Sequence, residues 1–244
     1  MYQEVYDLGS LNSTSRTAEQ LEIGIYWAYD GLPSLCAPPR LYMQLAMSLA
    51  YQQPMCLHAV EWARLVTATA VIMADAAIAA WDSKFYHNLA RPITGIRLND
   101  DPVWGDHNPA TIADPNWVPL GAPASNSNGP DFTPPFPAYP SGHATFGGAV
   151  FQTFRHIFGT DNIPFSFVSD EFNGITKDAN GNARPLKSRS FPNLSAAELE
   201  NGQSRVYLGI HWACDCDDGI ELGRKIADLA FQRKFGHRLL DLEL

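Results

Sequence analysis

Lys84 and Arg91 place two cations at the predicted end of a long apolar helix. The segment reads Lys84-Phe-Tyr-His-Asn-Leu-Ala-Arg91-Pro92, and Pro92 disfavours helix at the residue before it. Cations near a helix C-terminus are often solvated charges that interact favourably with the helix dipole. Taken alone, this segment therefore indicates a helix end rather than a binding site.

A second segment combines a helix start with a histidine. Ser141-Gly142-His143 precedes an apolar helical pattern, so Ser141 is predicted to cap the helix. Backbone N–H groups at a helix N-terminus have no partner within the helix, and they attract anions. The segment fits both an ordinary capped helix and an anion site.

A third segment runs from Ser204-Arg205 to His211 and Asp215. His211 and Asp215 are four residues apart, so they are predicted to share one helix face. A carboxylate in that position can fix the tautomer of the imidazole and raise the basicity of its other nitrogen. Pairs of this kind are also common as purely structural contacts.

Taken together, the three segments indicate one anion-binding site. Lys84, Arg91 and Arg205 would meet a helix N-terminus and two histidines if the segments converge. Arginine offers paired planar donors, and backbone N–H groups add directional hydrogen bonds. This combination is suited to a tetrahedral oxyanion.

The order of the three motifs is Lys-x6-Arg-Pro, then Pro-Ser-Gly-His, then Ser-Arg-x5-His-x3-Asp, complete between Lys84 and Asp215. It resembles the signature shared by vanadium-dependent haloperoxidases and the type 2 phosphatidic acid phosphatase superfamily. Further stretches resemble the fungal vanadium chloroperoxidase type, including Tyr-Trp-Ala-Tyr-Asp30-Gly and the run from Pro134 to Gln152. The resemblance covers nearly the whole chain.

The resemblance implies a role for each residue of the motifs. His211 would be the axial ligand of vanadium, and His143 the acid–base group beside the apical oxygen. The vanadate oxygens would be held by Lys84, Arg91, Ser141, Gly142 and Arg205. Asp30 resembles a carboxylate that steadies the arginines, and Asp215 resembles the partner that orients His211. Trp81 and Phe136 would form the wall of a halide pocket.

The leading functional hypothesis is a vanadate-dependent haloperoxidase. The family oxidises halide with hydrogen peroxide to hypohalous acid or an equivalent species, and vanadium acts as a Lewis acid. Vanadate is therefore the implied cofactor, hydrogen peroxide and halide are the implied substrates, and phosphate is expected to compete for the same site.

A phosphatase is the alternative, because phosphate and vanadate are both tetrahedral oxyanions. His211 would then be the nucleophile and His143 would protonate the leaving group. The aromatic rings of Trp81 and Phe136 favour a halide pocket, although such rings also pack in ordinary cores. A catalytically silent oxyanion-binding module is a third class, which the intact charged positions disfavour.

The elements that would position these residues are predicted to be helices. Helical patterns cover residues 16–29, 40–53, 60–82, 143–158 and 217–235. Residues 101–142 hold ten of the 18 prolines and are predicted to be a long ordered loop. Residues 159–203 are also predicted to be irregular. We expect a single all-α domain over 1–244, a helical bundle whose long loops form an oxyanion site at one end.

The charge and the hydropathy of the chain argue against nucleic acid and a membrane as partners. The net charge of −9 gives no general basic field for nucleic acid. The apolar run from Leu65 to Trp81 contains Asp75 and is predicted to be a buried helix rather than a membrane span. No segment resembles a signal peptide, so we expect a soluble protein whose compartment the sequence leaves open.

Relatives in the resembled family are generally longer, with a preceding helical half. The face that such a half would cover is expected to be apolar, and exposed apolar faces commonly become interfaces. We therefore expect a homodimer. The alternative is a piece of a longer protein, which would be monomeric or poorly soluble.

Overall fold

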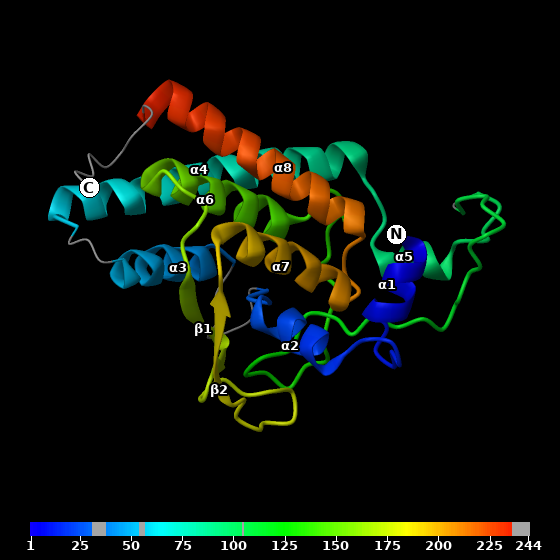
Figure 1. The fold of residues 1–244 in the computed structure, drawn as a ribbon. Coiled ribbons are helices and arrows are strands. Elements are labelled where there is room, and N and C mark those ends of the chain that lie inside the picture. The colour runs from blue at the N-terminus through cyan, green and yellow to red at the C-terminus, as the bar shows by residue number, and fades with distance from the viewer. Residues whose placement is uncertain (31–37, 54–56, 104, 236–244) are drawn as a thin grey trace.

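The computed structural model describes residues 1–30, 38–53, 57–103 and 105–235. The elements, labelled in Figure 1, follow in the order α1 (Tyr2–Gly9), α2 (Ala18–Tyr26), α3 (Pro38–Gln52), α4 (Ala59–His87), α5 (Pro92–Arg97), α6 (Gly142–Phe158), β1 (Phe165–Asn173), β2 (Leu186–Phe191), α7 (Leu194–Tyr207), α8 (Ala213–Ala230) and a π-helical turn, η1 (Phe231–Phe235). The predicted helical class is confirmed.

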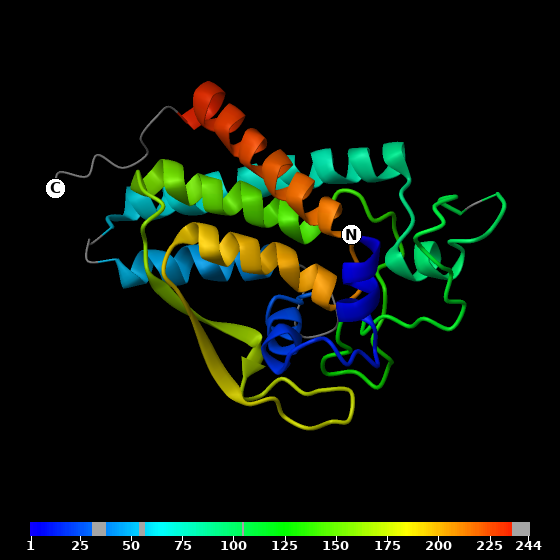
Figure 2. The ribbon, with the colours of Figure 1, turned by 45° about the vertical axis from the view of Figure 1, so that its right-hand side comes forward.

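Helix α6 is the centre of the bundle. Thirteen of its 17 residues are buried, and it contacts α3, α4, α7 and α8. In Figures 1 and 2, α3, α4, α6 and α7 run side by side while α8 crosses over them. A helix that is apolar on all sides must be covered on all sides, so the apolar composition of α6 dictates this central place.

Glycines allow α6 and α8 to approach closely. A Cβ atom added to Gly223 of α8 would lie 2.2 Å from the carbonyl oxygen of Thr145, and one added to Gly148 of α6 would lie 2.3 Å from that of Ile220. Both distances are too short for any side chain. The crossing therefore requires glycine on both helices, and it sets the N-terminus of α6 against the N-terminal part of α8.

Helix α4 is long and apolar enough to cross a membrane by length and composition. It instead packs against α3, α6 and α8, and it buries eight of its side chains, Leu65 and Ile72 among them. The helix is therefore only partly buried, with 39% of its most apolar stretch covered by the described residues, where the sequence predicted a buried helix. The helix extends five residues beyond its predicted end at residue 82, so that Lys84 lies in its last turn, and Asn88 ends it in a left-handed conformation.

The five predicted helices correspond to α2, α3, α4, α6 and α8 with its π-helical extension, each with shifted ends. Helices α1, α5 and α7 were not predicted. The prediction that residues 159–203 are irregular is wrong, because they form an antiparallel pair of strands and most of α7. Phe165 and Phe167 of β1 are buried, while Ser166 and Val168, which alternate with them, are exposed. The surrounding Asn, Gly and Ser residues obscured this alternation.

The proline-rich stretch from 101 to 141 contains no helix or ladder strand in its described residues, which confirms the predicted loop. Isolated bridges tie it to itself and to the N-terminal segment, through Ala122 with Phe132 and Ser10 with Pro119. It passes over the end of the bundle at which α6 begins and α4 ends (Figure 2). The loop is therefore placed to form one wall of a site there.

We expect Gly223→Ala to lower the free energy of unfolding by about 1–3 kcal/mol, because the added methyl group overlaps the backbone of α6. Chemical denaturation measures this. Gly129→Ala is the matched control, because Gly129 has only the Ser127 hydroxyl within 4 Å. The control should change stability by less than about 0.5 kcal/mol. Equal stability of both variants would contradict the close crossing.

Candidate active site

A cavity of about 560 Å³ opens where the ends of α4, α6 and α7 meet the start of α8. One part of its wall is polar and contains residues from all three sequence motifs, together with Asp30 after α2. These polar lining residues are Asp30, Arg91, Gly142, His143, Arg205 and His211. The convergence predicted from the motifs is thus observed, with Lys84, Ser141 and Asp215 behind the lining rather than in it.

Ser141 caps α6 as predicted. Its hydroxyl accepts a hydrogen bond from the Ala144 N–H, and its own N–H donates to the Asp215 carbonyl at 2.8 Å. A Cβ atom at Gly142 would lie 3.1 Å from the Trp81 ring, so glycine lets the first turn of α6 approach the aromatic wall. The N–H groups of that turn have no partner within the helix and are directed out of its end.

Lys84 is fully buried, and its ammonium group donates to backbone carbonyls. The acceptors are the carbonyl oxygens of Pro137, Ala138 and Pro140, at 3.0, 2.9 and 2.5 Å. Burial, together with the nearby charge of Arg91, lowers the pKa of Lys84 to about 7. Lys84 therefore fixes the segment before α6 and contributes positive charge to the site from behind.

Arg91 donates through Nε to the Phe136 carbonyl at 2.8 Å, and through one terminal nitrogen to the Ile210 carbonyl at 2.7 Å. The same nitrogen lies 2.9 Å from Nε2 of His211. Its other terminal nitrogen is buried and has no hydrogen-bond partner in the part of the chain that the structure describes. Burial lowers the pKa of Arg91 to about 10.

Arg205 is held from one side only. One terminal nitrogen donates to both carboxylate oxygens of Asp30, at 2.8 and 2.9 Å. Its Nε and its other terminal nitrogen are buried and have no hydrogen-bond partner among the described residues. With the nitrogen of Arg91, three buried guanidinium nitrogens around the cavity thus lack an acceptor. Buried donors left unpaired are costly, so an anion with several oxygen acceptors would satisfy them.

His211 and Asp215 are in contact, as the sequence predicted. The prediction that they share one helix face is wrong. His211 precedes α8, and Asp215 lies in its first turn, where its carboxylate accepts the Trp212 N–H at 2.9 Å. Nδ1 of His211 lies 3.0 Å from that carboxylate. The pair arises from helix capping, because a carboxylate in the first turn reaches back toward the residues before the helix.

The hydrogen bonds define the state of His211. Because Arg91 can only donate to Nε2, the proton of a neutral ring belongs on Nδ1, where it is donated to Asp215. Burial and the charges of Arg91 and Lys84 hold the pKa of His211 well below its usual range. Burial raises the pKa of Asp215 to about 6. His211 is therefore a neutral imidazole whose Nε2 lone pair faces the cations of the site.

His143 lies in the first turn of α6 and lines the cavity. Its Nε2 is hydrogen-bonded to the Ala28 carbonyl, and its own carbonyl accepts hydrogen bonds from Tyr42 at 2.7 Å and Asn201 at 3.0 Å. Burial, followed by the charge of Arg205, lowers the pKa of His143 to about 4. The ring is fixed and neutral near pH 7.

The opposite part of the wall is apolar. The rings of Trp81 and Phe136 lie 5.2 Å apart, and the Arg91 guanidinium lies 5.0 Å from the centre of the Phe136 ring. The remaining apolar lining comes from Pro38, Pro39, Ala77, Ile78, Phe132, Pro134, Pro135 and Phe146. Both predicted aromatic residues are thus at the cavity, next to its cations.

Sequence reasoning missed Tyr42 and Asn201, which hold the backbone of His143. A signal for Asn201 exists, because Glu198, Asn201 and Arg205 recur at helical spacing and are all buried in α7. Tyr42 has no such signal. His87 is exposed at the end of α4, and its ring contacts that of Tyr139 edge-on.

The sequence pattern of the VCPO second helical-bundle domain matches residues 64–238. The chain belongs to this family. The vanadium chloroperoxidase of Curvularia inaequalis is 38% identical over 237 aligned residues, which cover 84% of this chain and 38% of that enzyme. The chain thus spans well under half the length of that relative.

Solved structures show the same fold. A bacterial vanadium-dependent iodoperoxidase is 28% identical, with a TM-score of 0.65 over 95% of this chain and 48% of its own. The holo form of a bacterial vanadium-dependent chloroperoxidase is 20% identical, with a TM-score of 0.67 over 95% of this chain and 46% of its own. The latter likeness concerns the fold alone. In each case, the family member matches over about half of its chain.

Proposed function

We propose that this chain binds vanadate and acts as a vanadium-dependent haloperoxidase, oxidising halide with hydrogen peroxide to hypohalous acid or an equivalent halogenating species. The observation that supports this most strongly is the set of three partnerless guanidinium nitrogens around a neutral imidazole. Names of the relatives point the same way, since each is a vanadium-dependent peroxidase.

The donors at the cavity fit a tetrahedral oxyanion. Arg91 and Arg205 would hold its oxygens through nitrogens that lack acceptors, and Gly142 would do so through its backbone N–H. Ser141 would add its hydroxyl, and Lys84 its charge. His211 would be the ligand of vanadium through Nε2. Bound vanadate would supply Lewis acidity that activates peroxide toward halide.

His211 is prepared for this role by Asp215. The Nδ1 proton donated to Asp215 keeps the Nε2 lone pair directed at the cavity. A terminal nitrogen of Arg91 lies 2.9 Å from Nε2, so a bond from vanadium to Nε2 would require Arg91 to turn from the imidazole to the oxyanion. Arg91 would thus exchange a neutral acceptor for a charged one, which strengthens its hydrogen bond.

His143 is proposed as the acid–base group. When its Nε2 donates to the Ala28 carbonyl, Nδ1 carries the lone pair that accepts a proton from peroxide. A pKa lowered by Arg205 and burial keeps the ring unprotonated and ready to accept. A bound oxyanion would offset the charge of Arg205 and raise that pKa toward neutrality.

Trp81 and Phe136 are proposed to form the halide pocket. Their rings keep bulk water from one side of the site, while Lys84 lies 5.7 and 5.4 Å from the two ring centres. A halide at this wall would lose part of its hydration and gain the attraction of buried cations. The attraction would offset the cost of the lost hydration and hold the halide near the oxidising centre.

A phosphatase is the second candidate, and the tautomer of His211 favours it specifically. A neutral imidazole anchored through Nδ1 on a carboxylate, with Nε2 toward an oxyanion site, is also the arrangement of a histidine nucleophile. His143 would then protonate the leaving group. The apolar wall favours the haloperoxidase, because a polar phosphoester gains little from Trp81 and Phe136.

Activity after loading with orthovanadate should separate the two functions. We expect bromination of a dye by peroxide and bromide to require orthovanadate, and excess phosphate to inhibit it competitively because both anions use the same donors. The parallel control measures phosphoester hydrolysis without vanadate. Hydrolysis in the absence of bromination would contradict the haloperoxidase assignment, and activation unaffected by a large excess of phosphate would contradict the shared site.

Substitution of His211 should reduce vanadate-dependent turnover and vanadate affinity more than substitution of His143. His211→Ala is expected to abolish vanadate-dependent turnover and to weaken vanadate binding strongly, because it removes the metal ligand. His143→Ala should lower turnover by about 100-fold or more while retaining anion binding. Equilibrium titration with orthovanadate measures the vanadate affinity of both variants and shows which one loses more. A His211→Ala protein with wild-type vanadate affinity would refute the ligand assignment.

We also propose that the chain forms a homodimer through an apolar surface of α4. Ile78, Phe85 and Tyr86 are 70%, 65% and 83% exposed, and Ile78 and Phe85 are seven residues apart, so they share one helix face. Exposed apolar surface of this kind commonly marks an interface, and two-fold pairing is the commonest form of oligomer.

Light scattering tests the dimer. The expected mass is twice the 26.9 kDa of one chain, and Phe85→Glu should shift it toward the monomer. Val60→Glu is the control, because Val60 is equally exposed at the other end of α4. A stable wild-type monomer at micromolar concentration would disprove this pairing.

A further inference from the structure

Asp30 determines where Arg205 points. The carboxylate of Asp30 holds a single nitrogen of the guanidinium, and the two partnerless nitrogens are left for an anion. A guanidinium is planar, so fixing one nitrogen of a buried side chain fixes the directions of the others. The geometry of the proposed oxyanion site therefore depends on what fixes Asp30.

Asp30 follows a residue in an unusual conformation. Tyr29 has a φ of 45°, in the left-handed region that bulky residues rarely adopt. Contacts must hold it there. The Tyr29 hydroxyl accepts the N–H of Asp170, which precedes Glu171 in β1, at 2.5 Å and donates to Gln44 at 3.1 Å.

Asp170 and Glu171 both lie where β1 departs from regular pairing with β2. Val168 pairs with Ser188, and the next paired residue of β1 is Asn173, opposite Leu186. Residues 169–172 thus leave the ladder, and their polar groups turn toward the segment after α2. Ser169, for example, donates to the Tyr26 carbonyl at 2.6 Å. Strand irregularities are frequent beside functional sites, where they redirect side chains.

Glu171 is the most constrained member of this group. Its carboxylate is 1% exposed, and one oxygen accepts hydrogen bonds from Ser125 at 2.6 Å and Arg184 at 2.7 Å. Arg184 also donates to Ser125 at 2.8 Å. Burial, with the charge of Asp30 nearby, raises the pKa of Glu171 to about 7. A buried carboxylate tied to two distant loops is well suited to hold this part of β1 in place, together with the Asp170 N–H that binds Tyr29.

We propose that Glu171 is a positioning residue for the oxyanion site. Arg184 and Ser125 fix Glu171, and Glu171 thereby fixes the neighbouring Asp170 N–H that binds Tyr29. The left-handed turn at Tyr29 in turn directs Asp30 at Arg205. None of the three supporting residues lines the cavity. This proposal rests on the oxyanion site proposed above, and it predicts that anion affinity depends on Glu171 only through Asp30.

A double-mutant cycle tests this dependence, with orthovanadate as the probe and isothermal titration calorimetry as the readout. Glu171→Gln should weaken binding about tenfold in the wild-type background. Asp30→Asn should weaken it at least as much, and Glu171→Gln should add no further loss in the Asp30→Asn background. Losses that multiply would show that Glu171 acts independently of Asp30 and would overturn the proposal.

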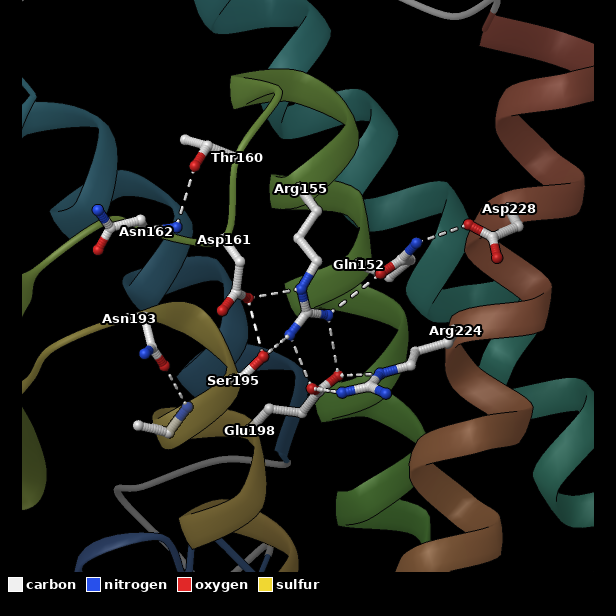
Figure 3. Close-up of polar contacts among 11 residues, drawn as sticks. Gln152, Arg155, Thr160, Asp161, Asn162, Asn193, Ser195, Glu198, Arg224 and Asp228 are labelled. Atoms are coloured by element: carbon white, nitrogen blue, oxygen red, sulfur yellow. Dashed lines mark hydrogen bonds and ion pairs between the residues drawn. The ribbon is translucent and has the colours of Figure 1, made fainter.

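Glu198 provides a matched control. Figure 3 shows its carboxylate between the guanidinium groups of Arg155 and Arg224, with Arg155 also bound to Asp161 and Gln152. It is as buried as Glu171, but it joins α6, α7 and α8 away from the cavity. Glu198→Gln should lower the melting temperature and leave orthovanadate affinity unchanged. An equal loss of affinity in this variant would reduce the effect of Glu171 to general destabilisation and overturn the proposal.

Ser125→Ala is a milder second variant, in case Glu171→Gln does not fold. It removes one hydrogen bond from Glu171, so it should weaken orthovanadate binding by a smaller factor, and only when Asp30 is present. Unchanged affinity would refute the proposal. Wild-type protein that binds no orthovanadate would instead refute the proposed function itself, so the two failures are distinguishable.

Discussion

Burial of three cations at one end of a helical bundle is the constraint on which the structure depends. Lys84, Arg91 and Arg205 are at most 6% exposed, and positive charges out of water are costly unless they are paired or hydrogen-bonded. Contacts within the chain offset only part of the cost of burying these charges. Backbone carbonyls surround Lys84 and Asp30 pairs with Arg205, while three guanidinium nitrogens have no acceptor within the described ranges. An anion with several oxygens would complete the compensation.

Much of the bundle can be understood as support for this arrangement. The glycines at the crossing of α6 and α8 bring Ser141 and Asp215 together. The Glu198 cluster joins α6, α7 and α8 outside the lining of the cavity, so it contributes to the stability of the bundle rather than to the site. Ion pairs as buried as these stabilise a fold only when every group is satisfied. The contrast is informative, because the Glu198 carboxylate is fully paired and the guanidinium groups at the cavity are not.

The sequence predicted the helical class and the convergence of the motif residues at one cavity, but not all of the elements around them. Lys84, His143, Arg205 and the other motif residues stand in short segments with fixed spacing, and that spacing survives any error in helix boundaries. The roles of these residues remain proposals. Helix α7 was missed because its buried face carries Glu198, Asn201 and Ser204, which give no apolar period. The bulge at Ser169 and the contact of Glu171 with Ser125 join residues far apart in sequence, and no local pattern could reveal them.

The central claim is that the unpaired guanidinium nitrogens and His211 Nε2 together receive one oxyanion. A crystal structure of the protein with orthovanadate tests this most directly. We expect vanadium bonded to His211 Nε2, with Arg91 turned from the imidazole to a vanadate oxygen and Arg205 still held by Asp30. Vanadate bound elsewhere, or seated in the cavity with Arg91 still on His211, would contradict the account.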